Sequence, residues 1–173
     1  MRCWRLVATL CIIETMTDKT CEQLIAELNT SQHKVSQLLA GLTEVQDWQR
    51  EPAEWSFRYL AAHLAAVERD CHRPRIARIA AGERPHFSAY IESGANFAHC
   101  DLAESLAVWA EERRGLLDFV AALSNKDLTN TGVYPVVGEM SLLEALDELH
   151  AQDQGHLRHI RQLIADYAEV SQA

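Results

Sequence analysis

The sequence predicts an all-α fold, an antiparallel four-helix bundle with long crossover connections. Glycine and proline are scarce, at 7 and 4 of 173 residues, and neither residue favours a helix interior. Four long segments repeat apolar residues at spacings of three and four, as one buried helix face requires. The connections between the later segments are too long for tight helical hairpins, which favours a bundle with crossovers.

The first helix is expected to begin at Thr17 or Asp18, both good N-cap residues, and to end near Val45. Gly41 weakens the helix close to its end. Its apolar residues recur at threes and fours and form one stripe: Leu24, Leu28, Val35, Leu38, Leu39 and Leu42.

The second helix follows Pro52, with Ser56 as its N-cap. Pro74 is expected to kink or interrupt it, because proline lacks the N–H of the helical hydrogen bond. Residues 80–96 read as a longer, irregular connection. The apolar face of this helix comprises Phe57, Leu60, Leu64, Val67 and Cys71.

The third and last helices each begin with a capping box. Asp101 and Glu104 open the third, which is expected to reach about Leu123. A turn-rich crossover follows, with a short β-hairpin expected within residues 132–138. Ser141 and Glu144 then open the last helix, which is expected to end near Tyr167.

We place a single domain at residues 16–173 and an N-terminal extension at residues 1–15. Arg2 and Arg5 precede an apolar run, as in a signal peptide, but no A-x-A cleavage pattern follows. A targeting signal therefore stays open as the alternative. Met16, followed by two good N-cap residues, is the better start for the folded unit.

The charge and the cysteines limit partners and compartment. A net charge of −9 disfavours binding to nucleic acid, because the phosphate backbone repels an acidic domain. No apolar run approaches the roughly 20 residues of a membrane span. The 5 cysteines form no C-x-x-C pair and are odd in number, which fits reduced thiols in a cytoplasmic protein.

Three histidines within residues 148–160 raise the question of a metal site. Because each residue of an α-helix turns about 100°, His150 and His159 point to opposite flanks of the helix. His156 falls near the middle of the apolar sector, between Gln152 and Asp153 at its two edges. The sector itself contains Leu146, Leu149, Ile160, Leu163 and Tyr167.

Only His156 therefore replaces an apolar residue, and the three-histidine cluster breaks up. Its best partner within the chain is His63, on the second helix. His156 is either a core histidine satisfied by one hydrogen bond or, with His63, the start of a zinc-type site.

The order of four features resembles the DinB/YfiT-like superfamily of metal-dependent enzymes, over roughly residues 20–167. The segment EWSFRYLAAHLAAVER (54–69) resembles the family's W-S-x-x-x-x-x-x-H-L signature. A long connection and a helix beginning SLLEAL (141–146) come next, and QDQGHLRHI (152–160) resembles the terminal H-D-x-x-H-x-x-Q/H-I pattern. The resemblance implies a four-helix bundle whose divalent metal is held by three histidines, one on the second helix and two on the last.

Carried over by position, His63 and His156 match two of these ligands, and Gln152 stands where the family has the third histidine. A glutamine oxygen binds zinc or nickel more weakly than imidazole does. Three arrangements stay open. Gln152 or a water completes a metal site; Asp153 completes it, which suits zinc, iron or manganese; or the site is metal-free and linked by hydrogen bonds. His159 matches a polar position that could orient a ligand, or it is a surface histidine.

The resemblance implies a metal-dependent transferase or hydrolase that acts on a small substrate and forms a homodimer. The metal would be zinc, nickel, iron or manganese. A low-molecular-weight thiol is a second implied cofactor, because a metal favours the reactive thiolate over the thiol. The alternative is a metal-free dimeric helical-bundle protein that binds a partner, with a site degraded at Gln152. No catalytic residue follows from the sequence.

Overall fold

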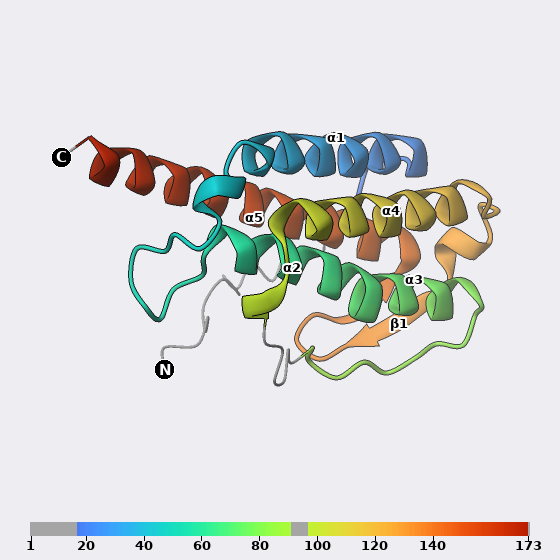
Figure 1. Cartoon of the computed structure of the whole chain (residues 1–173). Helices are drawn as coiled ribbons and strands as arrows, with labels where there is room; N and C mark the ends of the chain where they lie inside the picture. The colour runs from blue at the N-terminus through green and yellow to red at the C-terminus, as the bar shows by residue number, and fades with distance from the viewer. Residues whose placement is uncertain (1–16, 91–96, 173) are drawn as a thin grey trace.

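The protein is described by a computed structural model that covers residues 17–90 and 97–172, so the predicted extension at residues 1–15 lies outside the described residues. Figure 1 shows long helical rods packed side by side, with a hairpin at one end. The rods are α1 (Cys21–Ala40), α2 (Phe57–Val67) with its continuation, α4 (Leu102–Ala121) and α5 (Leu142–Ser171). The predicted all-α four-helix bundle is confirmed.

The helix order is unusual for a bundle. α1 packs against both α4 and α5, and α2 packs against α4, so the consecutive helices α1 and α2 lie diagonally opposite each other. Short 3₁₀ helices lie in the connections, at Thr43–Val45 (η1), Phe97–His99 (η3) and Asp127–Thr129 (η4). α2 and α5 are consequently the pair of rods whose side chains face each other across the remaining side of the bundle.

Side-chain caps fix most of the helix starts. Ser56, Asp101 and Ser141 cap α2, α4 and α5, and the capping box at Ser141 is complete. The first helix differs from its prediction, because Thr20 forms the capping box with Gln23 and the helix begins at Cys21. It also ends at Ala40, after which the chain tightens into η1. The complete capping box at Thr20 satisfies two backbone groups at once. Neither Thr17 nor Asp18 could satisfy both of them.

The α-helix is interrupted next to Pro74, as expected, but the chain stays helical through the interruption. The chain runs on from α2 through a π-helical segment, η2 (Glu68–His72), into α3 (Arg73–Ala80), with Pro74 in the first turn of α3. Figure 1 shows α2 and α3 as one continuous rod. A π turn is wider than an α turn and makes i→i+5 bonds, so it absorbs the hydrogen bond that proline cannot make.

A two-stranded antiparallel hairpin, β1 (Thr131–Tyr134) and β2 (Gly138–Ser141), closes the crossover into α5, as predicted. Its first strand also binds the chain that leaves α3. The Val133 amide donates to the Pro85 carbonyl oxygen at 2.8 Å, and the Phe87 amide donates to the Val133 carbonyl oxygen at 2.8 Å. The hairpin therefore holds residues 85–87 against the end of α3.

The apolar core is divided into two clusters along the bundle axis. One contains Phe57, Leu60 and Trp109, and the other contains Ile76, Leu116 and Leu146. On every rod the division falls at a buried polar residue: Ser31, Glu68, Arg113 and Asp153. A polar layer therefore crosses the middle of the bundle. None of the helices in the described part of the chain is long and apolar enough to cross a membrane.

Candidate metal centre

The structure brings His63 and His156 together across the gap between α2 and α5. Their ring centroids are 5.4 Å apart and the rings are tilted by 59°. Both side chains are partly buried. His63 lies on the flank of the buried face of α2, three residues after Leu60 and one before Leu64, both of which are buried.

His156 presents a buried polar atom to this gap. Its Nδ1 is buried and has no hydrogen-bond partner among the described residues. Burial, followed by the nearby imidazoles of His63 and His72, lowers the pKa of His156 to about 3. The ring is therefore neutral at pH 7, which leaves a nitrogen lone pair available to a metal or a proton.

Trp55 lines the outer side of the histidine pair. Its ring centroid lies 4.6 Å from that of His63 and 6.2 Å from that of His159. The partly buried His159 is thus packed against the same indole as His63, and burial lowers its pKa while Glu54 opposes the change. This placement fits an orienting role for His159, which stays a prediction.

Gln152 lies one turn before His156 and is exposed. Its Nε2 donates a hydrogen bond to Glu148 Oε1 at 3.3 Å. Gln152 and His156 line one small cavity, whose volume of about 10 Å³ is room for a single water molecule. The side chain therefore borders the place where the family has its third histidine, but with a neutral amide.

Asp153 occupies a different position from the one that helical spacing predicted. The expectation placed His156 near the middle of the buried face and Asp153 at its edge. In the structure Asp153 is 3% exposed and faces the centre of the bundle, while His156 lies on the flank toward α2. The buried position of Asp153 is compatible with its charge because Arg113 on α4 donates two hydrogen bonds to its carboxylate.

Arg113 binds Asp153 and Glu68 at the same time. Its Nη1 and Nη2 donate to Asp153 at 2.6 and 3.1 Å, and its Nε and Nη2 donate to Glu68 at 2.7 and 2.9 Å. A further bond of 3.4 Å reaches the Leu28 carbonyl oxygen. These bonds use all five N–H donors of the guanidinium. For Asp153 to bind a metal, it would first have to leave Arg113.

The two carboxyls of this layer are shifted in opposite directions. Burial acts to raise the pKa of Glu68, but Arg113 outweighs it and the pKa is lowered. Burial raises the pKa of Asp153, with Arg113 opposing and the Glu68 charge adding to the rise. Both side chains line the cavity that His156 also lines.

His72 is a residue of this centre that the sequence analysis missed. It ends η2 and lines the same cavity as Gln152 and His156. Burial lowers its pKa to about 4, against an opposing effect of Glu68. The helical spacing gave no signal for it, because the π-helical segment between His63 and His72 changes the direction in which His72 points.

A second group of ligating side chains lies on the opposite side of α5. Within the described residues it is the group whose ligand atoms all lie within 4.8 Å of one another, and it comprises Glu27, Asp147 and His150. The Lys19 ammonium lies among them, 2.8 Å from Glu27 Oε2, 2.9 Å from Asp147 Oδ1 and 3.4 Å from His150 Nδ1. The chain's own cation thus occupies the centre of this group.

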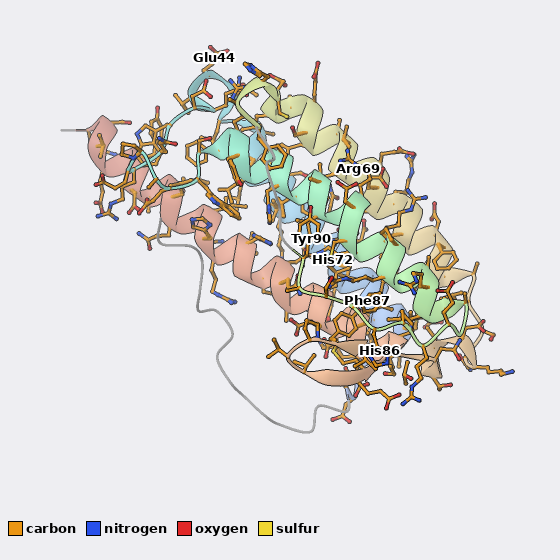
Figure 2. The ribbon with its side chains drawn as sticks, turned by 90° about the horizontal axis from the view of Figure 1, so that it is seen from below. Glu44, Arg69, His72, His86, Phe87 and Tyr90 are labelled. Carbon is orange, nitrogen blue, oxygen red and sulfur yellow. The ribbon has the colours of Figure 1, made fainter. Side chains whose placement is uncertain are left out.

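A larger groove of about 540 Å³ opens beside η2 and α3. The Arg75 guanidinium lies 5.0 Å from the Phe87 ring and 5.6 Å from the Tyr134 ring, and it donates to the Ser88 carbonyl oxygen at 2.7 Å. Figure 2 shows Phe87, His86 and Tyr90 on the same side of the molecule as His72. Arg78 pairs with Glu83, whereas Arg75 makes no ion pair with any described residue.

The donor set fits a divalent transition metal. Two imidazoles from different helices, one of them neutral at pH 7 and with a buried nitrogen that has no partner, are the groups that zinc, nickel or iron prefers. A third protein donor is needed for a stable site, and Gln152 is the weak donor at the expected position.

A protein of known structure has a similar fold. The structure is similar to that of YfiT from Bacillus subtilis, described as a probable metal-dependent hydrolase with an unusual four-helix bundle topology. The TM-score is 0.77 at 20% sequence identity, and the match covers 90% of this chain and 92% of that chain. A search of the curated proteins gives no match. The DinB superfamily matches residues 19–160, most of the described chain, and the protein therefore belongs to the DinB superfamily.

Proposed function

We propose that this protein is a metal-dependent hydrolase of small substrates, with a divalent metal bound by His63 and His156. One observation carries the proposal: His156 has a buried Nδ1 without a partner, and its ring lies 5.4 Å from that of His63. An unpaired buried polar atom costs about 1–3 kcal/mol, so a site that keeps one has a use for it. A metal bound here would supply an activated water at neutral pH.

The residues around the pair prepare it for this role. Trp55 packs against His63 and limits the directions in which the ring can turn. Burial keeps His156 neutral down to about pH 3, so protons do not compete with a metal at pH 7. The layer of Glu68, Arg113 and Asp153 fixes α4, η2 and α5 relative to one another beside the cavity.

The groove beside α3 suggests the class of substrate. Arg75 brings a positive charge without a carboxylate partner, flanked by the rings of Phe87 and Tyr134. Burial raises the pKa of Tyr134 to about 12, so its hydroxyl remains a hydrogen-bond donor at neutral pH. A guanidinium with a fixed orientation binds a carboxylate or a phosphate well. We infer a small substrate that carries a carboxylate or phosphate.

A transferase that uses a low-molecular-weight thiol is the second chemistry that we expect to test at the same centre. A metal held by two neutral imidazoles has open positions for a thiolate as well as for water. The two reactions differ in the nucleophile, not in the residues that hold the metal. A panel of small anionic esters and amides, with and without added thiol, separates them.

The proposal is tested by loading the purified protein with zinc, nickel or manganese and measuring turnover of this panel. We expect activity that is lost in His63→Ala and in His156→Ala. The matched control is His33→Ala, which removes an exposed histidine of α1 far along the chain from the site. Activity that survives both site substitutions would contradict the proposal.

A further inference from the structure

The centre lacks a strong third donor at the position that the family resemblance indicates. Gln152 is exposed, and its amide nitrogen is bound to Glu148. Asp153 is held by two hydrogen bonds from Arg113 and is buried away from the solvent. Asp153 is therefore not a free donor, and Gln152 offers only a neutral amide oxygen, which is a weaker donor than imidazole.

The opposite wall of the same cavity supplies an imidazole. Of the nine residues that line it, His72 and His156 are the two histidines, and they come from η2 and α5. Figure 2 labels His72 on the side of the helical rod that faces α5. The remaining walls are apolar or belong to the charged layer: Leu64, Val67, Glu68, Trp109, Arg113, Gln152 and Asp153.

The π-helical segment explains why His72 reaches this cavity. His72 follows His63 by nine positions, and in a regular α-helix of about 100° per residue the two would point in opposite directions. A π turn contains roughly one residue more than an α turn, which sets the following side chains back by about 100°. The segment Glu68–His72 therefore brings the direction of His72 to within about 80° of that of His63.

The electrostatic surroundings of His72 suit a metal ligand. Its neutral state at pH 7 follows from a pKa of about 4, set first by burial. Glu68, four residues earlier, is a buried carboxylate that binds Arg113. A cation bound by His72 and His156 would lie beside the charged layer without displacing any of its hydrogen bonds.

We propose that His72 is the third imidazole donor of this centre, in place of the family histidine that Gln152 replaces. The inference rests on the proposed function, since it concerns the same metal. The donor set would then consist of His63 and His72 from the rod of α2 and η2, and His156 from α5. A side-chain rotation on metal binding is part of it, because His63, His72 and His156 do not bring ligand atoms within 4.8 Å of one another in the structure.

The test is a competitive titration of zinc into the full chain and its variants, monitored with a chromophoric chelator. Loss of a group that only supports a ligand weakens metal affinity roughly 10–100-fold. We therefore expect His72→Gln, which keeps the size and polarity of the side chain, to lose at least roughly tenfold in affinity. His72→Ala provides a second variant, and circular dichroism melting verifies that each one folds.

A rescue experiment distinguishes a ligand from a structural residue. In the double variant His72→Gln/Gln152→His, the new imidazole on α5 should restore most of the lost affinity. Gln152→His alone should gain far less, because the third position is already filled. The exposed His33→Ala is the matched control and should bind zinc as the wild type does.

The outcomes separate the two proposals. Wild-type affinity in both His72 variants, together with loss of binding in His156→Ala, would overturn the role of His72 and leave the proposed function standing. Absence of zinc, nickel and manganese binding in the wild type would overturn both. Loss in the His72 variants with rescue by Gln152→His would establish the third donor.

Discussion

Two polar clusters lie next to each other in the middle of the bundle and differ in how well their atoms are paired. In the charged layer, Arg113 uses every N–H donor on Glu68, Asp153 and a backbone carbonyl oxygen. In the histidine pair, His156 keeps a buried nitrogen without a partner. In the first cluster every N–H donor of the guanidinium is paired in the fold, so we infer that this cluster stabilises the folded protein. The second is incomplete, so we assign it to binding.

The surface group around Lys19 provides a third case. It has the ligand spacing of a metal site, but the Lys19 ammonium makes hydrogen bonds of 2.8 and 2.9 Å to its two carboxylates. These bonds to Glu27 and Asp147 raise the pKa of Lys19, which keeps the amine charged. Spacing of ligands alone therefore does not identify a metal centre; an unpaired donor atom is the more telling sign.

The largest expected effect concerns Arg113. Arg113→Met removes the charge between two buried carboxylates, and breaking a buried ion pair costs about 3–5 kcal/mol. Urea denaturation at pH 7 measures the free energy of unfolding. The control Arg114→Met removes an exposed arginine that pairs with Glu111, and its effect should stay below about 1 kcal/mol. Equal effects of the two substitutions would contradict the structural role of the layer.

The next effect is acid destabilisation by the two buried imidazoles. In the unfolded chain they take up protons below about pH 6.5, but in the folded protein only below about 4 for His72 and about 3 for His156. Stability is therefore fully present above pH 6.5 and falls toward pH 4, by about 1.4 kcal/mol per pH unit for each histidine.

Chemical denaturation at pH 7.5, 6 and 5 measures this slope. His156→Gln should flatten it, because the variant has no imidazole to protonate at that position. His33→Gln should leave the slope unchanged. A slope that His156→Gln does not alter would show that His156 is not kept neutral by burial.

Asp153→Asn tests whether this residue belongs to the charged layer or to the metal centre. The substitution removes one carboxylate from Arg113, and loss of a hydrogen-bonded charge costs about 1.5–3 kcal/mol. We expect this loss in the free energy of unfolding and an unchanged metal content by elemental analysis. Loss of metal at normal stability would instead assign Asp153 to the centre.

The smallest expected effect is at Lys19. The pairs of Lys19 with Glu27 and Asp147 are partly exposed, so Lys19→Met should cost no more than about 1 kcal/mol. It also removes the cation from the ligand group. Added zinc should therefore raise the melting temperature of the variant at concentrations where the surface site of the wild type does not respond. To separate this effect from the histidine centre, both proteins are compared in a His156→Ala background.

Local patterns were enough to predict most of the fold. The caps at Ser56, Asp101 and Ser141 are short-range features, and the structure contains all three. The effect of Pro74 was harder to predict. The sequence shows that a helical hydrogen bond is lost at this proline, but not that a π turn accommodates the loss. The start of α1 was misplaced by a few residues, since several neighbouring side chains can cap a helix.

The site was predicted less completely because its geometry depends on other helices. Asp153 was placed at the edge of the buried face, since its partner Arg113 lies 40 residues earlier on another helix. His72 was missed, since a regular helix of 100° per residue points it away from His63. Both errors concern residues whose direction is set by tertiary contacts or by a non-α turn, which helical spacing does not describe.

The central claim is that the unpaired imidazole of His156 exists to hold a metal. Elemental analysis of untagged protein, purified without chelator, tests this claim most directly when His156→Ala is measured beside it. We expect close to one equivalent of a divalent transition metal in the wild type and none in the variant. A wild type that contains no metal and takes up no added zinc, nickel or manganese would contradict the claim.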